Sequence, residues 1–90
     1  MKAEAEKVTR LLKTARGQID GILKMIDKDR YCVDISNQLM ATSSILRKAN
    51  TEVLKAHLYR CAKSSMESGD DDEREQKIEE MIHIIEKSVS

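Results

Sequence analysis

Apolar side chains repeat with helical spacing along most of the chain, and the first run predicts a helix over residues 3–27. Its apolar positions alternate spacings of four and three, the pattern of one buried helix face. These positions are Val8, Leu12, Ala15, Ile19, Ile22 and Ile26, with Leu11 and Leu23 at the edges. Gly17 and Gly21 lie within this helix and either admit a close neighbour or are tolerated weak positions.

A second helix is predicted over residues 32–66, after the polar connection at residues 27–30. Leu39, Leu46 and Val53 mark one of its faces at a spacing of seven. The segment contains no proline and is much longer than an average globular helix. A helix of this length needs packing partners along all of it.

A third helix is predicted over residues 73–87, where Ile78, Met81, Ile82 and Ile85 share a face. Gly69 suits the end of the preceding helix, and the three aspartates that follow it suit the start of the next one. We therefore expect an all-α fold with a long central helix, forming one domain over residues 1–90.

The composition indicates a small aliphatic core. The 90 residues include no Phe, Trp or Pro, two Tyr and five Met. A monomer of this size buries little apolar surface, so we expect oligomerisation to contribute much of its stability. Residues 1–7 are charged and no apolar run approaches membrane length, so we expect no signal peptide and no membrane partner.

The net charge of zero hides an uneven distribution. Residues 1–30 carry eight Lys/Arg against five Asp/Glu, residues 31–66 five against two, and residues 67–90 three against nine. The first two thirds therefore offer a basic surface to a polyanion. The small number of aromatic residues argues against single-stranded nucleic acid, and duplex DNA, held through its phosphates, remains open. The candidate contacts are Arg10, Lys13, Arg16, Arg47 and Lys48.

Cys32, His57 and Cys61 are the candidate chemical groups. His57 and Cys61 are four residues apart, so a helix places them on one face. Cys32 lies 25 residues before His57, roughly 37 Å along a helix at about 1.5 Å per residue. An antiparallel pair of central helices, crossing near Ile45, would bring Cys32 of each chain beside the other two residues of its partner.

Three interpretations of these residues stay open on spacing alone. Two cysteines can be small buried apolar residues beside a surface histidine. Two sulfurs and one imidazole also suit a soft metal, and three ligands fit Cu(I) better than Zn(II), which usually takes four. In the third interpretation an oxidant or persulfide attacks Cys32, and Cys61 of the partner resolves the product. Two cysteines do not form a disulfide scaffold, and reduced thiols favour the cytoplasm.

Several motifs resemble those of the copper-sensing operon repressor family (CsoR-like). Asp29-Arg30-Tyr31-Cys32-Val33-Asp34-Ile35 with Gln38 is similar to its signature, and His57-Leu58 with Cys61 to its second ligand block. Gly17-Gln18 with Gly21-Ile22 is similar to its first helix, so the resemblance covers nearly the whole chain.

The resemblance implies a three-helix protomer that forms an antiparallel dimer and then a dimer of dimers. It implies that Cys32, His57 and Cys61 bind Cu(I) across the dimer, and that the metal-free tetramer binds double-stranded operator DNA. Copper then releases the DNA and derepresses copper efflux genes. Tyr31 and Glu80 correspond to residues that orient the ligand histidine. A copper chaperone is a candidate metal donor.

Departures from the family pattern shape the alternatives. Nickel- and cobalt-sensing relatives use an N-terminal histidine, and residues 1–31 contain none. Persulfide sensors keep both cysteines but lack the histidine, so His57 separates copper from persulfide. The loop at residues 68–73 is longer and more acidic than in the family. The length of this loop determines whether Glu80 is the residue that corresponds to the family's glutamate. His83 is interpreted as a surface residue.

The alternatives are therefore a persulfide- or redox-sensing repressor, a sensor of another transition metal such as nickel, and a copper-buffering protein. An enzyme is not expected. The chain has no base–nucleophile pair outside the ligand set and no Gly-rich phosphate loop.

Overall fold

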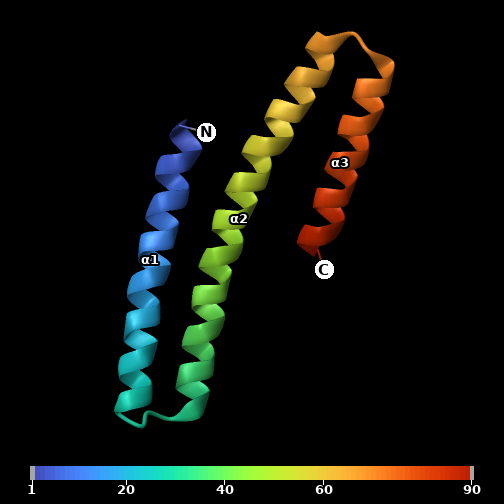
Figure 1. Cartoon of the computed structure of the whole chain (residues 1–90). Helices are drawn as coiled ribbons and strands as arrows, with labels where there is room; N and C mark the ends of the chain where they lie inside the picture. Colours follow the sequence, from blue (N-terminus) through green and yellow to red (C-terminus); the bar gives the residue numbers. More distant parts are fainter. Residues whose placement is uncertain (1, 90) are drawn as a thin grey trace. The chain divides into compact units, whose positions relative to one another are not determined.

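The computed structural model consists of three helices in chain order, α1 (Lys2–Asp27), α2 (Cys32–Ser68) and α3 (Asp71–Val89) (Figure 1). It describes the backbone of residues 2–89 and the side chains of residues 4–64, 67 and 69–87. The described backbone contains no strand, which confirms the all-α class and the three helices. Among the described helices, none combines the length and apolar character needed to cross a bilayer.

The turn between α1 and α2 is closed by backbone hydrogen bonds. The Asp29 N–H donates to the Ile26 carbonyl and the Arg30 N–H to the Met25 carbonyl, at 3.1 and 3.0 Å. This is the pairing of a Schellman helix end, and Asp29 takes the left-handed position with a φ of 50°. The Tyr31 carbonyl then accepts the first bonds of α2, from Asp34 and Ile35.

The turn between α2 and α3 lies within the predicted loop but is shorter, because α2 continues to Ser68 and α3 begins at Asp71 rather than at residues 66 and 73. Gly69 has a φ of 68°, a conformation that glycine adopts without the steric cost of a Cβ. Asp70 caps α3, because its side chain accepts a hydrogen bond from the Asp72 N–H at 3.0 Å. Acidic side chains also fill the first turn of α3, where they interact favourably with the helix dipole.

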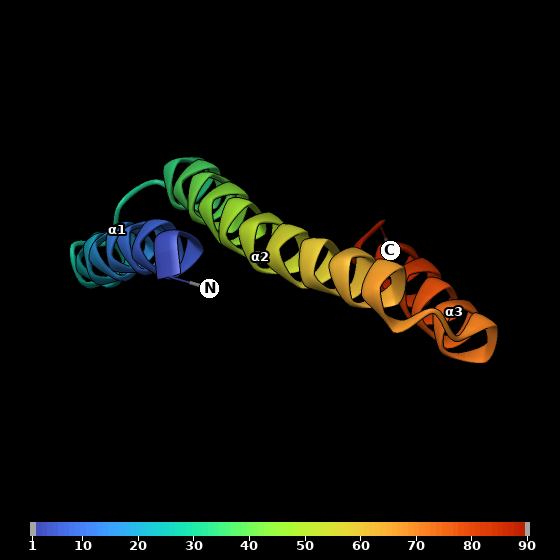
Figure 2. The ribbon, with the colours of Figure 1, turned by 90° about the horizontal axis from the view of Figure 1, so that it is seen from above.

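The chain forms two compact units, an N-terminal unit up to Val53 and a C-terminal unit from Leu54. In the N-terminal unit, α1 lies beside the first part of α2 in both views (Figures 1 and 2). Lys7 Nζ pairs with Glu52 at 3.1 Å, and Gln18 contacts Thr42 at 2.7 Å. The later residue of α1 contacts the earlier residue of α2, so the two segments are antiparallel.

Two helix faces with alternating spacings of three and four meet in the N-terminal unit. The buried or half-buried positions among the described side chains of α1 are Glu4, Ala5, Val8, Leu11, Ala15, Gln18, Ile22 and Met25. Those of α2 are Ile35, Gln38, Thr42, Ile45, Ala49 and Glu52. The centre of this interface consists of small side chains, and it includes a polar pair.

The single apolar face predicted for α1 is divided by the structure. Ala15 and Ile22 are buried, whereas Leu12, Ile19 and Ile26 stay exposed. The predicted apolar face of α1 therefore consists of two parts. One part packs on α2, and the other is an apolar stripe that stays exposed in this chain. Gly17 and Gly21 lie on open surface, because a Cβ at either one meets no atom within 4 Å.

The apolar positions of α2 at a spacing of seven are likewise uncovered. Leu39, Leu46 and Val53 are 53%, 44% and 39% exposed. They belong to a different face of α2 from the one that packs on α1. A row of half-exposed aliphatic side chains along a long helix is typical of an interface with another chain.

In the C-terminal unit the remainder of α2 packs against the antiparallel α3. Ala56 and Cys61 are buried, and Leu54, Leu58, Met81 and Ile84 are half-buried. Of the face predicted for α3, Met81 is half-buried while Ile78, Ile82 and Ile85 are about half exposed. Hence α3 also presents an apolar stripe beyond the one it uses within the unit.

Candidate metal centre and basic surface

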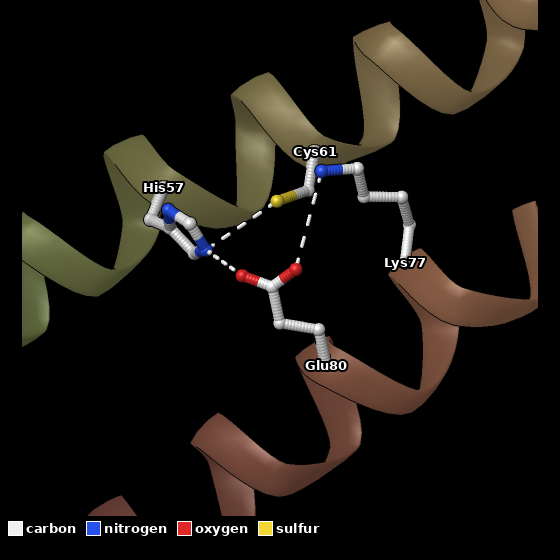
Figure 3. A network of polar contacts seen from close by, with 4 residues as sticks. All are labelled: His57, Cys61, Lys77 and Glu80. Carbon is white, nitrogen blue, oxygen red and sulfur yellow. Dashed lines mark hydrogen bonds and ion pairs between the residues drawn. The ribbon is translucent and has the colours of Figure 1, made fainter. Parts of the chain in front are cut away.

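Three potential ligand atoms converge in the C-terminal unit. His57 Nε2 lies 2.8 Å from Glu80 Oε1 and 3.4 Å from Cys61 Sγ. One ligand atom from each of the three residues lies within 4.8 Å of the others. Figure 3 shows the sulfur and the carboxylate approaching the same ring nitrogen from α2 and α3 respectively.

Local structure explains this convergence. His57 and Cys61 are one helical turn apart on α2, so their side chains project from the same face. The turn at Gly69 and Asp70 reverses the chain direction and sets α3 antiparallel to α2. Glu80 then projects from the middle of α3 toward His57.

The three residues of the cluster differ in how far they are exposed to solvent. Cys61 is 5% exposed, whereas the side chains of His57 and Glu80 are each 44% exposed. The sulfur therefore lies at the base and the two harder ligands at the solvent side. Lys77 Nζ lies 4.0 Å from the second carboxylate oxygen of Glu80, which holds that carboxylate from the same helix.

The contact with Glu80 defines the tautomer of His57. A carboxylate only accepts hydrogen bonds, so the N–H on Nε2 donates to Oε1. In the neutral ring, Nδ1 then carries the free lone pair. A carboxylate on one ring nitrogen and a lone pair on the other is the usual arrangement of a histidine that binds a metal.

The other predicted metal-site residues lie in the N-terminal unit. Cys32 is the first residue of α2 and is exposed, so the structure leaves its thiol open to another molecule. Tyr31 precedes it, with its side chain exposed and its carbonyl capping α2. The metal-ligand cluster found among the described residues contains neither of them. His83 is exposed, as expected.

The predicted basic residues border adjoining depressions on the N-terminal unit. Arg47 and Lys48 line a groove of about 500 Å³ together with Lys7 and Leu11. Lys7, Leu11 and Arg10 also line a second depression, and Arg10 and Lys13 line a third. Two groups that are far apart in sequence thus form one surface, which we call the basic surface. Arg16 is exposed on α1 but lines none of these depressions.

Sequence reasoning missed two features of these sites. Lys7 is not among the candidate DNA contacts predicted from the sequence, although it lines two of the depressions. The hydrogen bond to His57 fits the orienting role implied for Glu80, but the same oxygen also lies within 4.8 Å of Cys61 Sγ and so belongs to the set of potential ligand atoms. The sequence does not show that an acidic residue on a solvated helix face lies close to His57 and Cys61, because this depends on the register between the antiparallel helices α2 and α3.

Comparison with known proteins identifies the family of this chain. Residues 4–87 match the model of the family described as metal-sensitive transcriptional repressor. The chain is 34% identical to the copper-sensing transcriptional repressor CsoR of Bacillus subtilis over 84 residues, which cover 93% of this chain and 80% of that protein. It is 39% identical to CsoR of Mycobacterium tuberculosis over 74 residues, covering 82% of this chain and 60% of that protein.

A solved structure extends the likeness to the fold. The chain matches the copper-sensing repressor CsoR with Cu(I) from Geobacillus thermodenitrificans with a TM-score of 0.80 at 30% identity. The match covers 100% of this chain and 91% of that one. The chain therefore belongs to the family of metal-sensitive transcriptional repressors.

Proposed function

We propose that this chain is a Cu(I)-sensing transcriptional repressor, which binds operator DNA without copper and releases it when Cu(I) binds. The observation that carries the proposal is the pairing of His57 with Cys61 at 3.4 Å in a chain similar to copper-sensing repressors. The paired residues are one nitrogen and one sulfur, and a second sulfur would complete a soft three-ligand set.

The second sulfur in this proposal is Cys32 of a partner chain. Its thiol is exposed at the start of α2. The uncovered stripe of Leu39, Leu46 and Val53 supports an antiparallel pairing of two α2 helices. A two-fold interface repeats each contact, so one dimer contains two equivalent sites. The exposed apolar stripes of α1 and α3 supply surface for a further pairing to a tetramer.

The ligand set favours Cu(I) over Zn(II) in a site of this composition. Thiolates and imidazole are soft or borderline ligands, and a d10 monovalent ion accepts three of them. Zn(II) in a structural site usually takes four protein ligands. In this arrangement His57 contributes Nδ1, because Nε2 donates to Glu80. The imidazole must then turn from its contact of Nε2 with Cys61 Sγ so that Nδ1 faces the sulfur. Tyr31 of the chain that supplies Cys32 is the second proposed orienting residue.

Glu80 gives the site a connection to α3. The hydrogen bond from His57 joins α2 to α3 within the C-terminal unit. A change in the position of the imidazole on metal binding therefore acts on α3 through this carboxylate. We propose that this coupling favours a tetramer packing with lower affinity for DNA. By linkage, DNA then weakens copper binding by the same factor.

The proposed DNA contacts are the basic residues of the N-terminal unit. They are Arg10, Lys13, Arg16, Arg47 and Lys48, with Lys7 added by the structure. A tetramer repeats this surface four times, which suits a long duplex held through its phosphates. Such a protein works in the cytoplasm, where its thiols stay reduced and a copper chaperone can deliver the metal.

Anaerobic titration with Cu(I), while binding to the DNA upstream of its own gene is followed, tests the function. We expect DNA release at about one Cu(I) per chain, because a dimer contains two equivalent sites. Cys32→Ala should abolish release, whereas Ser36→Ala, one turn further along α2, should not. His57→Ala should keep some copper binding through the cysteines but lose release.

Two results would contradict the function as stated. Tight Cu(I) binding with DNA still held would point to another inducer, and persulfide and then nickel would be tested next. Copper-dependent release at wild-type strength in His57→Ala would show that the coupling does not pass through the imidazole.

A further inference from the structure

The cluster of Cys61, His57 and Glu80 contains a complete set of ligands within one chain. Its three ligand atoms are a sulfur, a nitrogen and a carboxylate oxygen, all within 4.8 Å of one another. The copper site proposed above uses only two of these residues as ligands and needs Cys32 of a partner. The cluster therefore has a coordinating capacity beyond the copper site.

We propose that Cys61 Sγ, His57 Nε2 and Glu80 Oε1 of a single chain bind Zn(II) in a second mode that excludes Cu(I). In this mode Glu80 is a ligand and Cys32 is not. The proposal stands whether or not the copper function is correct, because every ligand belongs to one C-terminal unit.

The observed distances are close to those of a tetrahedral zinc site. With Zn–S near 2.3 Å and Zn–N and Zn–O near 2.0–2.1 Å, neighbouring ligands lie roughly 3.6 Å apart for sulfur and nitrogen and roughly 3.4 Å for nitrogen and oxygen. The structure has 3.4 Å between Sγ and Nε2 and 2.8 Å between Nε2 and Oε1. The third pair, Sγ and Oε1, lies within 4.8 Å and must close to roughly 3.6 Å, so the carboxylate has to move away from Nε2 and toward the sulfur. When the metal binds, the ring proton moves from Nε2 to Nδ1 and the Cys61 thiol loses its proton to solvent.

The exposure of the cluster suits a three-ligand site with a water in the fourth position. Cys61 lies at the base, while the half-exposed His57 and Glu80 leave the outer side open to solvent. The charges also balance, because one thiolate and one carboxylate neutralise a divalent cation. Lys77 sits against the second oxygen of Glu80 and leaves Oε1 directed at the ring.

The carboxylate is what separates the two metals. Carboxylate oxygen is a hard ligand that suits Zn(II) and not the soft Cu(I) ion. The two modes also use opposite ring nitrogens of His57, Nε2 for zinc and Nδ1 for copper. Since they share His57 and Cys61, one chain holds either metal and not both. Zinc bound in this way joins α2 to α3 without bridging two chains.

The test compares Zn(II) and Cu(I) affinities, each by competition with a chelator, in the reduced full-length protein. Co(II) serves as the spectroscopic probe of the zinc mode. Cys32→Ser should keep Zn(II) affinity while losing tight Cu(I) binding. Glu80→Gln should lower Zn(II) affinity by about 100-fold, because loss of a direct ligand should cost at least as much as the largest losses seen for groups that only orient a ligand. The same change should alter the Co(II) spectrum. Glu79→Gln, which alters the adjacent exposed carboxylate, should change neither.

Three results would overturn the zinc mode. One is loss of Zn(II) affinity in Cys32→Ser, which would make zinc a bridging metal. Another is a Zn(II) affinity of Glu80→Gln that differs by less than about threefold from that of the original chain. Such a change is smaller than the loss expected even for a group that only orients a ligand. The third is weakened binding in Glu80→Gln with an unchanged Co(II) spectrum, which would reduce Glu80 to a positioning residue. Failure of Cu(I) binding alone would count against the copper function and not against this site.

Discussion

Thr42 in the N-terminal unit and His57 in the C-terminal unit are both polar residues of α2 that reach a polar side chain on a neighbouring helix. Thr42 is 4% exposed, and its hydroxyl lies 2.7 Å from Gln18 Oε1 and 3.1 Å from the Gln38 carbonyl. His57 is 44% exposed and has a further ring nitrogen available. A polar group that is buried and fully paired specifies structure, whereas one that is half-exposed among other ligands can bind a metal.

The two units also differ in the sign of their net charge. Up to Val53 the chain carries ten basic against seven acidic side chains, and from Leu54 onward it carries six against nine. The basic surface and the uncovered stripe of α2 belong to the first unit, and the cluster of ligand atoms to the second. Assembly and DNA binding can therefore be altered separately from the metal chemistry.

The largest expected effect comes from the uncovered stripe of α2. Leu46→Ala removes about 2 kcal/mol of apolar burial per copy, twice per two-fold interface, so the dimer dissociation constant should rise about 10³-fold. Sedimentation or light scattering against concentration measures it. Cu(I) affinity should fall with the dimer, while Zn(II) binding within one chain should persist.

Met40→Ala is the matched control for Leu46→Ala. Met40 is exposed on α2 but lies off the stripe at a spacing of seven. If Met40→Ala weakens the dimer as much as Leu46→Ala does, the interface does not follow the predicted stripe.

The next effect breaks the polar pair of the N-terminal unit. Thr42→Val leaves Gln18 without its partner in the helix interface and should lower the free energy of unfolding by about 1–3 kcal/mol. Urea denaturation measures it, and metal affinity should not change. Thr51→Val is the control, because Thr51 makes the same bond to the carbonyl four residues earlier but is exposed.

A double variant sharpens this result. Gln18→Met with Thr42→Val replaces both partners by apolar groups and should recover most of the lost stability. A double variant as unstable as the sum of the two single changes would show that the pair has no specific coupling.

The smallest effect concerns the basic surface. Lys48→Gln should remove one phosphate contact per copy and reduce the slope of log affinity against log salt by about 1 for each copy that contacts the duplex. Gel shift or fluorescence anisotropy over a salt series measures it. Lys63→Gln, an exposed change in the C-terminal unit, should leave the slope unchanged. Equal slopes for the original chain and Lys48→Gln would place the DNA elsewhere.

Part of the candidate site was predictable from local spacing. Residues four apart on a helix share a face, so the pairing of His57 and Cys61 followed from the sequence once that segment was helical. Glu80 followed from family resemblance, and no local pattern distinguishes it from Glu79 or Glu86. Its contact depends on the register between α2 and α3, which the turn at Gly69 and Asp70 defines.

The division of the apolar faces was not predictable from periodicity. Val8, Leu12, Ala15, Ile19 and Ile22 form one repeating pattern, yet Leu12 and Ile19 are exposed while Ala15 and Ile22 are buried. A hydrophobic period shows that a face is apolar, but not which neighbour covers which half of it.

The sequence by itself determined the three helices, their ends to within two residues and the distribution of charge, because periodicity, glycine and capping residues act over a few neighbouring positions. The tertiary structure alone decided which apolar stripe packs within the chain and how closely Glu80 approaches His57. It also decided that Arg10 and Lys13 share a surface with Arg47 and Lys48. These outcomes depend on the register between antiparallel helices, which is set by contacts between residues far apart in the chain.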